Sequence, residues 1–94
     1  MADHILIVVS GHQTLGSSGE PTGWFCSEVS HPLEVFREAG FNVTFCSPQG
    51  GATKPDPGSL DRSDPLNSKL LDSKADMESL ASTFKPEELD ASAY

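Results

Sequence analysis

The residue best suited to chemistry in this sequence is Glu28, which follows a glycine-rich segment and opens a helical pattern. Apolar residues surround it, with Trp24-Phe25-Cys26 before it and Val29 after it. A carboxylic acid in apolar surroundings can stay protonated and donate a hydrogen bond to a nearby thiolate. The alternative is a solvated glutamate in a first helical turn, where the helix dipole favours negative charge. Spacing alone leaves both interpretations open.

A thiolate partner for such an acid is hard to find in this chain. Its two cysteines, Cys26 and Cys46, are each followed by serine, so neither has an adjacent histidine as a base. Cys46 closes an apolar run, where a cysteine behaves as a small apolar residue. Cys26 lies two residues before Glu28, whose negative charge would raise the pKa of the thiol. We therefore expect neither cysteine to act as a nucleophile.

The segment 11–23 predicts a long loop, because turn formers and helix breakers dominate it. Loops of this length in a compact domain are usually functional or disordered. A loop after the first strand reaches the carboxyl end of a parallel sheet, where ligands bind. We expect Gly11, His12, Gly23 and Trp24 to line a substrate pocket there. His12 could instead be a solvated loop histidine, and Trp24 either a lid over the pocket or a dimer contact.

Neither a metal nor a cofactor is expected. The histidines His4, His12 and His31 lack metal-ligand spacing. The glycine-rich loop has neither the G-x-G-x-x-G order of a dinucleotide site nor the lysine of a P-loop.

A strand–helix–strand unit must position these residues. Residues 4–10 contain an unbroken apolar run, 5–9, that does not alternate with polar residues, which is typical of a strand covered on both faces in a parallel sheet. A helix is predicted over 28–39, with Pro32 placing its regular start near His31. Its apolar stripe comprises Val29, Leu33, Phe36 and Ala39. The run 41–46 predicts a second strand directly after it. Short joints between the three elements indicate a βαβ unit with parallel strands.

The remaining half of the chain is less regular. Residues 47–63 are irregular, with room for a short extended piece or hairpin. Asp64-Pro65 predicts the start of a helix that runs to about Ser73. Weaker helical patterns cover 76–83 and 85–89. Since two parallel strands need neighbouring strands and helices on both faces, we expect this domain to be incomplete on its own.

Composition narrows the classes of partner. The chain has 94 residues, which allows at most one small domain, and a net charge of −8. A field of that sign repels phosphate backbones and anionic lipid surfaces, so no nucleic acid and no membrane is expected as a partner. The run 5–9 is too short to span a bilayer or to form a signal-peptide core. We expect a cytoplasmic protein.

Two motifs carry a family resemblance. The first is TGWFCSEVSHP over residues 22–32, followed by Phe36 and Ala39-Gly40-Phe41. The second is SPQGG over 47–51, followed by the Asp-Pro-Gly-Ser of 56–59. In this order they resemble the N-terminal half of the DJ-1/PfpI superfamily, a group similar to class I glutamine amidotransferases, and in particular its Hsp31-like branch.

The resemblance implies a flavodoxin-like α/β sandwich with a cysteine nucleophile on a strand-to-helix elbow, beside a histidine. Glu28 matches the family glutamate that contacts this cysteine. Members of the branch are described as glutathione-independent glyoxalases that convert methylglyoxal to lactate, also called glyoxalase III or D-lactate dehydratase. They are further described as stress-response holdase chaperones and are commonly homodimers.

The departure from the family pattern is the missing elbow, since no Cys-His pair occurs in this sequence and residues 90–94 look like the lead-in to a third strand. We therefore expect residues 1–94 to form the N-terminal portion of one DJ-1/PfpI-like domain. Its partner would be a complementary C-terminal half or a full-length relative, and its substrate a small aldehyde. The alternative is an inactive short binding or holdase protein that docks through an exposed sheet edge.

Overall fold

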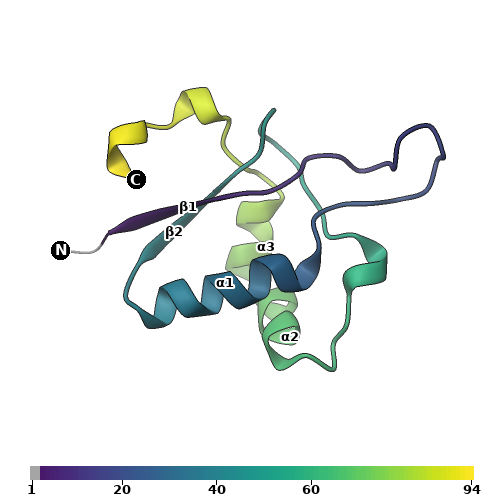
Figure 1. Cartoon of the computed structure of the whole chain (residues 1–94), viewed down its shortest axis with the longest axis horizontal. Helices are drawn as coiled ribbons and strands as arrows, with labels where there is room; N and C mark the ends of the chain where they lie inside the picture. Colours follow the sequence, from purple (N-terminus) through teal and green to yellow (C-terminus); the bar gives the residue numbers. More distant parts are fainter. Residues whose placement is uncertain (1–2) are drawn as a thin grey trace.

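A computed structural model describes residues 3–94 and contains a two-stranded parallel sheet packed against three α-helices (Figure 1). Strand β1 spans His4–Val8 and strand β2 spans Asn42–Cys46. The two strands pair in parallel from His4↔Asn42 to Val8↔Cys46. Helix α1, Cys26–Glu38, connects them, which confirms the predicted βαβ unit.

The other elements follow β2 in the order η1 (Pro57–Ser59), α2 (Pro65–Asp72), α3 (Lys74–Leu80), η2 (Pro86–Glu88) and η3 (Ala91–Ala93). The predicted start of α2 is confirmed, because Asp64 accepts a hydrogen bond from the Leu66 amide and Pro65 occupies the first turn. The helical turn predicted over 85–89 is η2. Helix α3, predicted over 76–83, begins and ends earlier. The Ser73 side chain fixes its start by accepting a hydrogen bond from the Asp76 amide.

The predicted start of α1 near His31 is wrong. The helix begins at Cys26 and carries Pro32 in its interior. Its first turn is held from outside the helix, because the Cys26 amide donates to the buried Ser59 hydroxyl at 2.9 Å. This contact satisfies one of the N–H groups that a helix start leaves free. Pro32 has no N–H to donate, so the carbonyl of Glu28 lacks its helical partner there.

One hydrophobic core joins the sheet to all three helices. Its members are Val9, Trp24, Cys26, Val29, Leu33, Phe45, Leu70 and Leu80, with Ile7, Val43, Leu71 and Met77 packed against them. On β1, therefore, Ile7 faces the helices, while Leu6 and Val8 alternate to the other face of the sheet. Val8 is 61% exposed. The expectation that this strand is covered on both faces is wrong for residues 3–94, because the three helices pack against one face.

The C-terminal segment returns to the sheet at two places. Phe84 adds a single parallel bridge to Cys46 on β2. Farther along, the ring of Tyr94 packs edge-on against His4 at 6.2 Å between centroids. Since Phe84 and β1 both pair with β2, β2 has neighbours on both edges, whereas β1 pairs only with β2 among residues 3–94.

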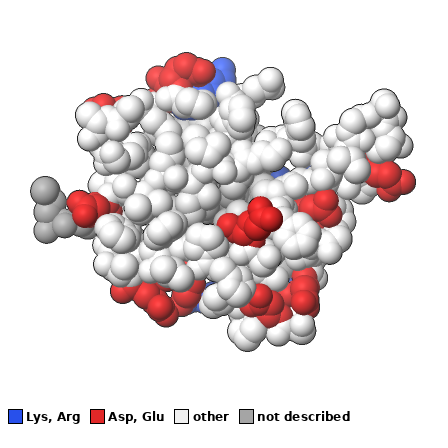
Figure 2. All heavy atoms as spheres, viewed as in Figure 1, with Lys and Arg blue, Asp and Glu red and all other residues white. Residues whose placement is uncertain are grey.

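Acidic side chains are spread over the face seen in Figure 2, with few basic ones among them. This distribution agrees with the net charge of −8. Within residues 3–94, no helix has the length and apolar character needed to cross a membrane.

Candidate functional site

A concavity of about 290 Å³ lies where β1 ends and α1 begins. The segment Val8–Ser10 forms one wall, and Gly23–Phe25 together with Glu28 and Val29 forms the other. This is the carboxyl end of the sheet, where parallel α/β folds bind ligands. The structure thus places Glu28, Gly23 and Trp24 together, as the sequence predicts.

The carboxylate of Glu28 is nevertheless exposed to solvent. The prediction of apolar surroundings holds for the lining of the concavity, but the prediction of a desolvated acid is wrong for this chain by itself. The apolar neighbours stand beside the carboxylate without covering it. Any group that removes water from Glu28 must therefore come from outside residues 3–94.

Gly23 is held against the backbone of the second loop. A Cβ atom at this position would overlap the carbonyl oxygen of Lys54 and would lie 2.7 Å from the carbonyl carbon of Pro55. The same approach lets the Trp24 amide donate to Lys54 at 3.1 Å, and the Asp56 amide donate to the Trp24 carbonyl at 2.8 Å. Glycine is thus required by the close approach of two backbones.

Trp24 is neither a lid nor a dimer contact, which corrects both interpretations of this residue. It is only 4% exposed and belongs to the core. Its indole nitrogen donates to the Thr53 hydroxyl at 3.0 Å. A buried indole with a satisfied N–H is a fixed wall of the concavity.

Three residues of the two family motifs, none of which is predicted from the sequence to be a site residue, hold together the loops at this end of the sheet. Thr22 donates to the carboxylate of Asp56 at 2.8 Å. The other oxygen of Asp56 accepts from the Gly58 amide at 2.7 Å. Ser59 donates to the Asp56 carbonyl at 2.7 Å while it accepts from α1. The Asp-Pro-Gly-Ser sequence was the available signal, because an Asp before a Pro-Gly pair typically caps a turn.

Gly11 and His12 lie apart from Glu28, in a second cavity of about 440 Å³. The end of β1 forms one side of this cavity, and residues 48–50 after β2 form the other. The two cavities share Val8–Ser10 as a common wall. The structure therefore divides the predicted substrate pocket in two, one cavity on each side of the end of β1.

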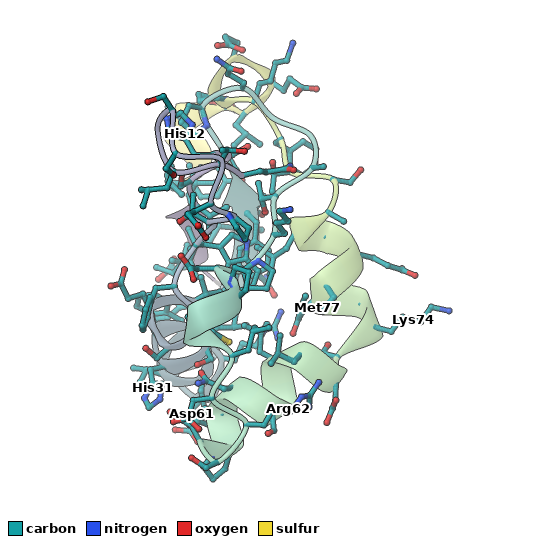
Figure 3. All side chains as sticks on the ribbon, turned by 90° about the vertical axis from the view of Figure 1, so that its right-hand side faces the viewer. His12, His31, Asp61, Arg62, Lys74 and Met77 are labelled. Carbon is teal, nitrogen blue, oxygen red and sulfur yellow. The ribbon has the colours of Figure 1, made fainter. Side chains whose placement is uncertain are left out.

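His12 is exposed, and its backbone amide donates to the Ser10 hydroxyl at 3.1 Å. Figure 3 shows His12 near one end of the molecule and His31 near the other. His31 pairs with Asp64 at 2.6 Å. Among residues 3–94, no group of three or more His, Cys, Asp or Glu side chains is arranged to hold a metal ion.

Both cysteines are buried, at 0% exposure for Cys26 and 1% for Cys46. Burial raises the pKa of each thiol, and the negative charge of Asp64 raises the pKa of Cys26 further. A buried thiol with a raised pKa is a poor nucleophile. The prediction that neither cysteine acts in this role agrees with their placement.

Comparison with known proteins identifies the class of protein that this chain resembles. No family model matches the chain. Its sequence and structure are similar to part of the glyoxalase III and Hsp31-like members of the DJ-1/PfpI proteins, at their N-terminal portion. The resemblance and the fold class predicted from the sequence are confirmed to this extent.

Among the particular relatives, glyoxalase 3 of Candida albicans is 38% identical over 50 residues, which cover 53% of this chain and 21% of that protein. The crystal structure of a Candida albicans glyoxalase III superposes with a TM-score of 0.77 at 26% identity, over 98% of this chain and 40% of that one. Rapid Encystment Protein 24 KDa of Francisella tularensis gives a TM-score of 0.88 at 26% identity, over 98% and 41%. The chain thus spans about a fifth of the curated relative and about two fifths of the solved structures.

Proposed function

We propose that this chain supplies one half of a glyoxalase III-type active site, which converts methylglyoxal to lactate. The other half is a complementary polypeptide, defined here as a second chain that carries a Cys-His elbow. The observation that carries the proposal is the position of Glu28, on the wall of an open, apolar-lined concavity at the carboxyl end of the sheet. In this proposal Glu28 acts as the supporting acid, and docking of the second chain would remove the water around it.

The reaction needs a nucleophile that this chain does not offer, because both of its thiols are buried. The thiolate of the complementary polypeptide adds to the aldehyde carbon of methylglyoxal, and the resulting oxyanion takes a proton. The proton on that carbon is then removed and returned to the neighbouring carbonyl carbon, while the hydroxyl proton moves to the former ketone oxygen, which leaves a thioester of lactate. Water hydrolyses the thioester and returns the thiol. Glu28 would donate its hydrogen bond to the cysteine sulfur and hold it in place for the first step.

The test uses the part of Candida albicans glyoxalase III that follows the region matched by this chain, co-expressed with the 94-residue chain. We expect lactate to form from methylglyoxal. Glu28→Gln should lower the rate by about 100-fold or more, the usual effect of losing a positioned acid. Glu38→Gln, on the exposed far end of the same helix, is the matched control and should leave the rate unchanged. Equal rates for both variants would contradict the proposal.

A second candidate function is a non-enzymatic holdase. It is favoured by large apolar side chains that are about half exposed or more, among them Val8, Phe25 and Phe84. Such surfaces mark sites of protein interaction. As a holdase, the chain alone should be folded by circular dichroism and should suppress aggregation of a heated client protein at roughly equimolar ratio. A chain that is unfolded without a partner would exclude this candidate.

A further inference from the structure

Helix α1 has no cap of its own at the turn that carries Glu28. Its N-cap position is Phe25, whose side chain offers no hydrogen-bond acceptor, whereas serine, threonine, aspartate and asparagine are the usual residues there. Phe25 instead lines the concavity together with Glu28. Because the next residue, Cys26, is buried, its N–H needs an acceptor from another part of the chain.

Ser59 supplies that acceptor from the loop after β2. The Cys26 amide donates to the Ser59 hydroxyl at 2.9 Å, and this hydroxyl donates in turn to the carbonyl of Asp56 at 2.7 Å. Ser59 is only 4% exposed, so both hydrogen bonds are shielded from water. A hydroxyl group that accepts from one segment and donates to another holds the two segments in a fixed arrangement.

The loop that contains Ser59 also holds Trp24, the residue before the N-cap position. The amide of Trp24 donates to the carbonyl of Lys54 at 3.1 Å, and its carbonyl accepts from the amide of Asp56 at 2.8 Å. The chain is therefore tied to this loop on both sides of the N-cap position. Glu28 lies two residues beyond the second tie.

The helix itself holds Glu28 less firmly than it holds an ordinary helical residue. The Glu28 amide donates to the carbonyl of Phe25 at 3.0 Å. The Glu28 carbonyl, however, lacks the usual partner four residues farther on, because Pro32 has no N–H. The position of Glu28 therefore depends on contacts from outside the helix, and Ser59 makes one of them through Cys26.

From these contacts we infer that Ser59 is a positioning residue for the proposed reaction. Its hydroxyl fixes the first turn of α1 and so sets where the Glu28 carboxyl group meets the nucleophile of the complementary polypeptide. This inference rests on the proposed function and adds a residue to it. Ser59 does not line the concavity, so its effect on the reaction passes through α1 and Glu28.

The first experiment is a double-mutant cycle on lactate formation, with the C-terminal part of Candida albicans glyoxalase III in saturating excess over the 94-residue chain. Ser59→Ala should lower kcat by about 10-fold to 100-fold, the effect of a small misplacement of a catalytic group, and leave KM for methylglyoxal within about twofold. Combined with Glu28→Gln, which already removes the acid, Ser59→Ala should cost less than about twofold more. An unchanged kcat, or the same loss in both backgrounds, would overturn the inference.

The matched control is Ser30→Ala, because Ser30 is also a buried serine, at 3% exposure, and also connects α1 to a distant segment. Its hydroxyl donates to the side-chain oxygen of Asn67 at 2.5 Å. Each variant removes a buried hydroxyl group, so both should lower the urea midpoint, but only Ser59→Ala should lower kcat. Equal loss of kcat from both variants would overturn the inference. Ser59→Cys, whose thiol is a weaker acceptor, takes the place of Ser59→Ala in the cycle if the alanine variant does not fold.

Amide hydrogen exchange separates this inference from the proposed function, because it does not depend on lactate. In the 94-residue chain, Ser59→Ala should make the Cys26 amide exchange faster by about tenfold or more relative to the amides of β2, and Ser30→Ala should leave this ratio unchanged. An unchanged ratio for Ser59→Ala would overturn the inference even if lactate forms. A complex that forms no lactate, together with faster exchange at Cys26 in Ser59→Ala, would contradict the proposed function and support Ser59 as the anchor of the turn that carries Glu28.

Discussion

The indole nitrogen of Trp24 donates to the hydroxyl of Thr53 at 3.0 Å, and that hydroxyl donates in turn to the carbonyl of Leu80 at 2.6 Å. All three residues are buried. This chain of hydrogen bonds connects the wall of the candidate site to the last residue of α3. The position of the concavity therefore depends on α3, a helix that does not line it.

Removing the middle member of this chain should destabilise the fold. Thr53→Val leaves the Trp24 indole N–H buried without an acceptor, which costs about 1–3 kcal/mol of the free energy of unfolding. Urea denaturation measures the loss. Thr14→Val, in an exposed part of the glycine-rich loop, is the control and should change stability by less than about 0.5 kcal/mol. A Thr53 variant as stable as the control would show that the hydrogen bond contributes little.

The two glycines that border the cavities should respond differently to an added methyl group. At Gly23 the new Cβ would overlap backbone atoms of Lys54 and Pro55, which cannot move without separating two loops. We expect Gly23→Ala to cost about 2–3 kcal/mol by overpacking. At Gly11 the nearest atoms lie 3.9 Å away, an ordinary contact, so Gly11→Ala should be close to neutral. Similar urea midpoints for the two variants would contradict this account.

The stability of the fold should fall in acid through the pair of Arg37 and Asp76. Arg37 donates two hydrogen bonds of 2.8 Å to Asp76, which lowers the pKa of that carboxyl group. The pair therefore stabilises the fold above the ordinary aspartate pKa of about 3.9, and this contribution disappears as the pH falls through the lowered pKa of the folded state.

Asp76→Asn should reduce the free energy of unfolding at pH 7 by about 1–2 kcal/mol, a value kept small because Arg37 is 45% exposed. The loss should shrink as the pH is lowered below about 4, since the wild type loses the same contribution there. Asp72→Asn, which removes an exposed pair with Arg62, should have a smaller effect. A pH profile of unfolding by urea distinguishes the two variants. An Asp76→Asn loss that stayed constant down to pH 2 would argue against the linkage.

The two thiols should be protected from modification. Because burial raises the pKa of Cys26 and of Cys46, little thiolate is present at neutral pH and reagents cannot reach it. Ellman's reagent should label neither cysteine in the native chain and both in urea. Fast labelling of one cysteine in the native state would reopen the question of a nucleophile within this chain.

The sequence predicts the elements of this fold better than their surroundings. The apolar runs identify β1 and β2, and Asp64-Pro65 identifies the start of α2, because these signals are local. The start of α1 was missed, since the Ser59 hydroxyl that caps Cys26 lies 33 residues away along the chain. The burial of Trp24 does not follow from local sequence for the same reason, because its acceptor Thr53 lies 29 residues away along the chain.

In the candidate site, too, some features follow from the local sequence and others depend on residues that are distant along the chain. The position of Glu28 follows from local order, strand then loop then helix, and the structure agrees with it. The exposure of the Glu28 side chain does not follow from the neighbouring sequence. Its burial would need atoms from other parts of the structure to cover the carboxylate, and the residues next to it in sequence do not do so. Gly11 and His12 also lie in a different cavity from Glu28, since the end of β1 separates the two.

The central claim, that Glu28 faces the nucleophile of a complementary polypeptide, is tested most directly by trapping the two residues together. Glu28→Cys in the 94-residue chain, co-expressed with the C-terminal part of Candida albicans glyoxalase III, should form a disulfide with the partner's cysteine under mild oxidation. Intact mass of the non-reduced complex detects it, and Glu38→Cys on the same helix is the control. A covalent complex with Glu28→Cys alone supports the account. No complex, or equal amounts with both variants, would contradict it.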